Sequence, residues 1–245
     1  MTAVRDLWIV LCKEWLELRS SDSGWVTVST LVAFLAIAGV FVPWQLGLVW
    51  IDGPWVALIW AWMPMFLVTT VTADSVAGER ERHTLETLLA TRLSESSILW
   101  GKWLAGVTWI WCAMALCLPI GLVTVNLTVE GGPYLPTMGQ AAGVLAASFA
   151  GAGLGAAVGV LVSMRATSVR HAQQILAIGV LLIALVPIGL LRMLPRGWTV
   201  GLFEALAYGS PARLAWTLAA LLTLLGLPVL VLAQTRFRRG KIPLK

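Results

Sequence analysis

Residues 74–102 read DSVAGERERHTLETLLATRLSESSILWGK, and this charged stretch lies between two long apolar runs. Its leucines recur at the three- and four-residue spacing of a helix: Leu85, Leu88, Leu89 and Leu93. Polar side chains such as Glu86 fall on the opposite face of that helix. A short amphipathic helix with this many neighbouring charges is too polar for hydrocarbon. The stretch therefore predicts a helix over about 83–94 that lies at the membrane face and contacts a soluble partner.

The composition on either side of this stretch is that of a membrane protein. Hydrophobic residues make up 59% of the 245 residues and charged residues only 12%, whereas soluble domains have about 45–50% and about 25%. The apolar residues come in runs near the roughly 20 residues that one helix needs to cross a bilayer. The sequence therefore predicts an all-α polytopic membrane protein with one transmembrane domain over 23–245.

Six apolar runs are expected to cross the membrane, which places both termini on one side. They are about 25–42, 55–73, 98–125, 140–164, 175–191 and 213–233. Of the seventeen Lys and Arg, all but Arg192, Arg196 and Arg213 then lie on the side of the termini. Because basic residues accumulate on the cytoplasmic side, the termini and residues 74–102 are predicted to face the cytoplasm, across the inner membrane. The same bias explains the net charge of +5, and nucleic acid is not an expected partner.

Two segments are too polar to cross. In residues 1–22, Lys13, Glu14 and Glu17 interrupt the apolar core that a cleavable signal would need. Apolar side chains instead form one stripe, which predicts a helix lying in the membrane interface in contact with lipid; packing against a soluble partner is the alternative. Residues 195–211 are expected to form a short re-entrant segment on the far side, before the last span.

Small residues recur at every fourth position of the fourth span: Gly143, Ala147, Gly151, Gly155 and Gly159. Such spacing lets a second helix approach closely. The pattern itself leaves open whether that helix belongs to the same chain or to a second copy.

No catalytic or metal-binding pattern is present. The two histidines and three cysteines have no metal-ligand or nucleophile spacing, and the chain has no phosphate-binding loop for ATP. We therefore expect neither an enzyme nor a resident cofactor or metal. An intramembrane hydrolase and a membrane scaffold or immunity protein remain as alternative classes.

Polar residues that could line a transport pathway are few. The candidates are Thr27, Ser29, Thr30, Gln173 and Gln174. Without strong charges inside the spans, an amphipathic or lipid-linked cargo is favoured over a small ion.

The charged stretch resembles the signature of ABC-2 type permeases, the membrane subunits of a class of ATP-driven exporters. That signature reads roughly Glu-Arg-Glu-x-Gly-Thr-Leu-Glu-x-Leu-Leu-x-Thr-Pro-x-Ser, followed by Gly-Lys at the next helix. Residues 79–94 match most of it, and Gly101-Lys102 follows. His83 stands where glycine is usual and Arg92 where proline is usual, which affects the turns on either side of the short helix.

The resemblance implies two permeases, identical or homologous, joined to two copies of an ABC ATPase that binds ATP and Mg. The helix at Thr84–Leu93 would be the coupling helix in a groove of that ATPase, and the first and fifth spans would line the pathway. The leucines would supply packing and the charged residues orientation; the alternative is that the charges only solvate a loop. The expected coupling residues are Glu79, Arg80, Glu81, Arg82, Thr84, Leu85, Glu86, Leu88, Leu89, Thr91 and Leu93.

Overall fold

The structure is a computed structural model that describes residues 2–20, 29, 31–84, 90–207 and 209–237. The described residues are helical with short connections and contain no strand, which confirms the all-α class. Four helices are long and apolar enough to cross a membrane: α5 (Pro54–Glu81), α7 (Glu95–Thr128), α8 (Met138–Ser163) and α11 (Pro211–Arg236). Two shorter apolar stretches, Leu31–Leu46 and Val169–Ile183, correspond to the first and fifth expected spans.

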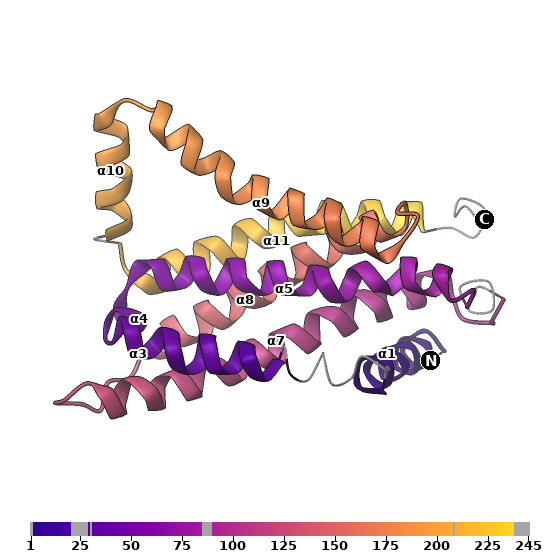
Figure 1. The fold of residues 1–245 in the computed structure, drawn as a ribbon, viewed down its shortest axis with the longest axis horizontal. Coiled ribbons are helices and arrows are strands. Elements are labelled where there is room, and N and C mark those ends of the chain that lie inside the picture. Colours follow the sequence, from indigo (N-terminus) through magenta and orange to yellow (C-terminus); the bar gives the residue numbers. More distant parts are fainter. Residues whose placement is uncertain (1, 21–28, 30, 85–89, 208, 238–245) are drawn as a thin grey trace.

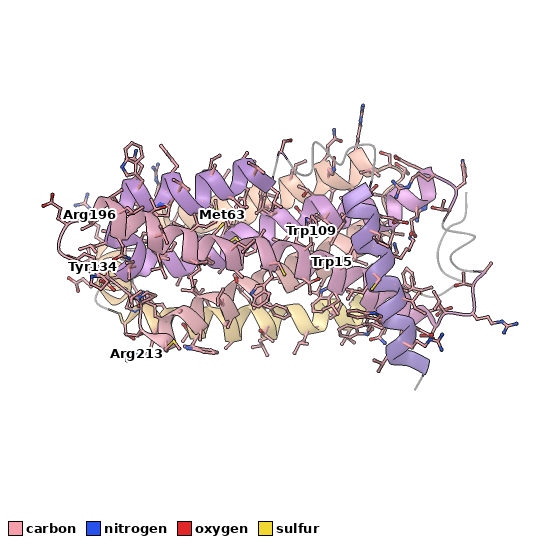
Figure 2. All side chains as sticks on the ribbon, turned by 90° about the horizontal axis from the view of Figure 1, so that it is seen from below. Trp15, Met63, Trp109, Tyr134, Arg196 and Arg213 are labelled. Atoms are coloured by element: carbon pink, nitrogen blue, oxygen red, sulfur yellow. The ribbon has the colours of Figure 1, made fainter. Side chains whose placement is uncertain are left out.

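The long helices lie side by side, and the first described helix and the C-terminal end of α11 lie at the same end of the bundle (Figure 1). Helix α1 (Thr2–Ser20) crosses that end at a steep angle to the long helices. Helix α10 (Arg196–Ala207) lies across the opposite end, within residues 195–211, and a re-entrant segment there stays a prediction. Arg196 and Arg213 lie at that opposite end, far from Trp15 of α1 (Figure 2). We refer to the end that holds α1 and the C-terminal end of α11 as the terminal end.

Helix α8 packs in the middle of the bundle because its small residues allow close approach. A Cβ atom on Gly151 would overlap the carbonyl oxygen of Ala61, and one on Gly155 would lie 2.5 Å from the carbonyl oxygen of Met65. Both partners belong to α5 of the same chain. Gly143 instead faces α11, where a Cβ would lie 3.0 Å from the Cβ of Ala215. The small-residue spacing thus serves contacts within the chain, to two different helices.

The first apolar stretch is built from short pieces. A π-helical turn, η1 (Leu35–Phe41), leads into α3 (Val42–Leu46), whose Pro43 cannot donate a backbone hydrogen bond. Helix α4 (Val49–Asp52) follows, and Gly53 and Pro54 then cap and begin α5. The chain thus turns at 52–54, just before the second expected span begins at residue 55.

Helix α9 (Val169–Met193) packs on the bundle only near its start. Ala172 and Leu176 are buried against Ala73 and Ala166, whereas Leu182, Leu185 and Leu190 further along are more than half exposed. Figure 1 shows the second half of α9 diverging from α5 and α11 towards α10. A helix apolar on all sides needs lipid or another protein to cover it.

Candidate functional site

Helix α5 is longer than the sequence predicted, and its last turn holds Glu79, Arg80 and Glu81 of the charged stretch 74–102. The expected span ended at Ala73, but the helix continues to Glu81. At its end, the amide of Thr84 donates to the carbonyl of Glu79 at 2.9 Å, and His83 has a left-handed φ of 57°. This is the capping geometry in which glycine is normally favoured. His83 therefore keeps the turn that glycine would form at this position of the signature.

The middle of the stretch lies outside the described residues. Residues 85–89, with Leu85, Glu86, Leu88 and Leu89, are not described; residues 82–84 and 90–94 form turns and bends rather than helix. A coupling helix over 83–94 therefore stays a prediction. Ser94 then caps α7 by accepting a hydrogen bond from the amide of Ser97 at 3.1 Å. We call residues 82–94 the coupling segment.

Beside the coupling segment, four charged side chains from three helices form what we call the charge cluster. Its members are Lys13 and Glu14 of α1, Glu79 of α5 and Lys102 of α7. Oε1 of Glu79 accepts from Lys13 at 2.8 Å and lies 2.9 Å from the ammonium of Lys102. The ammonium of Lys102 also donates to Oε1 of Glu14 at 2.7 Å. Glu17 adds an outer ion pair to Lys13 at 3.0 Å.

Two members of the charge cluster are deeply buried. The side chains of Glu79 and Lys102 are only 3% and 1% exposed. A buried charge without a partner costs several kcal/mol, on the order of 3–5, so each of these groups depends on its neighbours. Oε2 of Glu79 is buried and has no hydrogen-bond partner in the part of the chain that the structure describes. Burial alone lowers the pKa of the Lys13 ammonium, but the nearby charges of Glu14 and Glu79 outweigh it and raise the pKa above its ordinary value.

The same place has the only grouping of metal-ligand type among the described residues. Carboxylate oxygens of Glu14, Glu17 and Glu79 lie within 4.8 Å of one another. The ammonium of Lys13 is within 3.4 Å of all three carboxylates. The positive charge that such a grouping could bind is therefore already supplied by Lys13.

Arg80 and Glu81 connect α5 to the turn between α8 and α9. Arg80 donates to the carbonyls of Met164 at 2.9 Å and Ala166 at 2.7 Å, where the C-terminus of α8 leaves acceptors without a helical partner. Glu81 accepts from the amide of Val169 at 2.9 Å, in the first turn of α9. Each charge has the sign opposite to the helix end that it meets. Three consecutive residues, 79–81, thus connect α5 to α1, α7, α8 and α9.

One more polar contact ties the same part of α5 to α8. The hydroxyl of Ser163 donates to the carbonyl of Ala73 at 2.9 Å and accepts from the amide of Ala77 at 2.9 Å. Ser163 is the next small residue in the α8 series after Gly159. The hydroxyl therefore bonds directly to backbone groups of α5 instead of merely allowing close approach.

The remaining predicted residues lie around this site or away from it. Arg82 is half-exposed and pairs with Asp74 at 3.3 Å. Thr91 is exposed, and Leu93 packs against the buried cluster that includes Ile98 and Leu99. Of the pathway candidates, Ser29, Gln173 and Gln174 are exposed, while Thr27 and Thr30 lie outside the described residues. Neither these coupling residues nor the described pathway candidates belong to the charge cluster.

Sequence reasoning missed how α1 contributes. The expected apolar stripe does hold exposed side chains, such as Val4 and Trp8, but two residues of the polar side, Lys13 and Glu14, face the bundle rather than water. Glu14 is buried, and Val10 fills the space beside Gly101. One residue in the sequence could have indicated this contact. Lys102 follows Gly101 near the start of an apolar helix, and a lysine buried there needs a carboxylate partner.

These features define a helical membrane protein in which the residues just before segment 82–94 are bonded to several helices of the bundle. Residues 57–240 match the model of the ABC-2 family transporter proteins, and the chain belongs to this family. It is therefore a membrane component of an ABC transporter.

One relative is the ABC transporter permease protein NatB of Bacillus subtilis (strain 168), which is 30% identical over 135 residues. The match spans 49% of this chain but only 34% of NatB.

Proposed function

We propose that the chain is the permease subunit of an ATP-driven exporter, and that its coupling segment receives the motion of a separate ABC ATPase. The observation that supports this most strongly is the position of Glu79, Arg80 and Glu81. Their hydrogen bonds and ion pairs reach α1, α7, α8 and α9. A push on the adjacent segment would therefore reach most of the transmembrane helices at once. We therefore propose that these three residues transmit the motion of the coupling segment to the other helices. Contact with the ATPase would be made by residues 82–94.

In the proposed orientation, the terminal end of the bundle faces the cytoplasm. Six crossings, counting residues 31–46 and α9 with the four long helices, put both termini and the coupling segment in the cytoplasm. Only a few basic residues, such as Arg196 and Arg213, then lie on the outer side, as is usual for membrane proteins. An open polar groove between Arg92–Ser96 and the end of α11 (Gln234, Thr235) lies beside the segment and would add to the ATPase contact.

A second copy of the permease, paired through residues 31–46 and α9, would complete the pathway. The support is the exposure of apolar side chains on these elements, including Phe41 and Trp44 on the first and Leu182 on the second. Gln173 and Gln174, exposed in the first turns of α9, would face the pathway entrance. An amphipathic or lipid-linked cargo fits a surface of this kind, because no charged side chain is described between Arg170 and Arg192 on α9.

Co-purification from membranes tests the proposal. The tagged permease should bring down a protein with a phosphate-binding loop and vanadate-sensitive ATPase activity. Leu88→Asp and Leu89→Asp, which place a charge on the expected contact face, should keep the permease in the membrane but lose that ATPase. Full recovery of the ATPase with both variants would contradict the proposed contact.

A further inference from the structure

Helix α1 is attached to the bundle through both polar and apolar groups. On the side facing the bundle, Val10 fits against Gly101, and Glu14 reaches Lys102. The indole of Trp15 donates to the hydroxyl of Thr108 at 3.2 Å, and its ring meets the edge of Trp109 at 5.5 Å between centroids (Figure 2). The large apolar side chains Val4, Trp8 and Leu16 point outward instead. Apolar burial alone therefore does not determine where α1 sits.

The ion pairs of the charge cluster join three helices, so all of them form only when α1, α5 and α7 are packed together. Lys102 of α7 pairs with a carboxylate of α1 and with one of α5. Glu79 of α5 pairs with an ammonium of α1 and with one of α7. Moving any one helix by a few ångströms would separate buried opposite charges, which is costly in a low-dielectric interior.

We propose that Glu79 and Lys102 are positioning residues that hold α1 to the roots of α5 and α7, so that movement of the coupling segment carries α1 with it. This rests on the proposed function, because it is the ATPase that would move the segment. Glu79 precedes that segment by three residues, and Lys102 follows it by eight. The two residues thus close the base of the segment and link it to the helix that lies across the terminal end.

A positioning role fits the energetics better than a purely stabilising one. Replacing a buried ion pair with apolar groups of similar shape is often neutral or stabilising, so such pairs are weak evidence for stability. Oε2 of Glu79 has no hydrogen-bond partner among the described residues, and burying it in this way lowers the stability further. What the charge cluster provides is a single allowed arrangement of three helices.

The test measures the position of α1 relative to α7. Spin labels are placed at Trp8→Cys on α1 and Ser96→Cys on α7, both exposed, with Cys12→Ser, Cys112→Ser and Cys117→Ala as background. Their distance is measured by double electron–electron resonance on the full permease–ATPase complex in lipid nanodiscs, without nucleotide and trapped with ATP and vanadate. We expect one narrow distance that is the same in both states. A distance that changes on trapping would overturn the proposal, because α1 would then not travel with α7.

The variants separate positioning from folding. Glu79→Gln should broaden the distribution and shift it to longer distances, whereas Asp74→Asn, the same change at an exposed ion pair of the same helix, should leave it unchanged. The double variant Glu79→Gln/Lys102→Met removes both charges, so its thermal stability should return towards that of the parent while its distances stay broad. Unchanged distances in Glu79→Gln and in the double variant would overturn the proposal. Failure of the ATPase to co-purify with the parent chain would instead count against the proposed function, and the effect of the variants on the α1–α7 distance could still be measured on the permease alone.

Discussion

The ammonium of Lys102 lies 2.9 Å from a carboxylate oxygen of Glu79, although the coupling segment separates the two residues in the sequence. Glu79 is in the last turn of α5 and Lys102 is in the second turn of α7. Their contact closes the base of the segment, so the segment leaves and re-enters the bundle at one fixed place. Under the proposed function, a force that the ATPase applies to the segment would be shared by both helices.

The turn that ends α5 predicts a stabilising substitution. His83 has φ of 57°, a conformation that costs a residue with a side chain about 1–2 kcal/mol. We expect His83→Gly to raise the free energy of unfolding by about 1 kcal/mol. Thermal unfolding in detergent measures this. Arg82→Gly, one residue earlier at φ of −82°, is the matched control and should give no gain. A lower unfolding temperature for His83→Gly would contradict the capping interpretation.

The packing of α8 on α5 predicts a sharp contrast between two glycines. Gly151→Ala places a methyl group against the backbone of Ala61 and should destabilise the protein by about 1–3 kcal/mol. Gly179→Ala, where an added Cβ would meet no described atom within 4 Å apart from the adjoining backbone of its own helix, should be neutral or slightly stabilising because alanine favours helices. Thermal unfolding of both variants checks the prediction, which would be wrong if the two behaved alike.

Arg80 is expected to matter for the turn between α8 and α9. Arg80→Met removes two charge-assisted hydrogen bonds to Met164 and Ala166, each worth about 1.5–3 kcal/mol. Amide hydrogen exchange in residues 164–172 should become faster. Arg165→Met, an exposed arginine in the same turn, should leave the exchange rates unchanged. Equal protection in both variants would show that Arg80 does not hold the turn.

The raised pKa of Lys13 predicts that α1 tolerates alkaline conditions. Since the pKa is higher in the folded protein, the ion pairs contribute fully below the ordinary lysine pKa of about 10.4 and are lost only as the pH rises through the higher folded value. The mobility of a spin label at Leu16→Cys should stay constant from neutral pH to about 10. Release of α1 near pH 8 would contradict this.

Local features of the chain could be predicted from the sequence, because their causes are local. The Ser94 cap needs only a hydroxyl before a helical run, and the close approach at Gly151 and Gly155 needs only small residues at helical spacing. The class of protein follows from the length of the apolar runs. The extension of α5 to Glu81 could not be predicted, because the apolar pattern stops at Ala73 and the polar residues beyond it are satisfied by other helices.

The charge cluster could not be predicted for a related reason. Glu14, Glu79 and Lys102 are far apart in sequence, and helical periodicity does not say which helices become neighbours. The polar side of α1 was expected to face water, as it would on an isolated interfacial helix. In the structure, Lys102 and Glu79 provide partners for Glu14 and Lys13, so these two side chains face the bundle, while apolar side chains such as Val4 and Trp8 are exposed.

Site-specific photo-crosslinking in native membranes tests the central claim most directly. A photoreactive amino acid is placed at Arg92, an exposed residue of the coupling segment, or at Arg196, an exposed residue at the opposite end. The account predicts that the Arg92 probe crosslinks to a phosphate-loop ATPase and that the Arg196 probe does not. An ATPase crosslinked through Arg196 and not through Arg92, or no ATPase at either position, would contradict it.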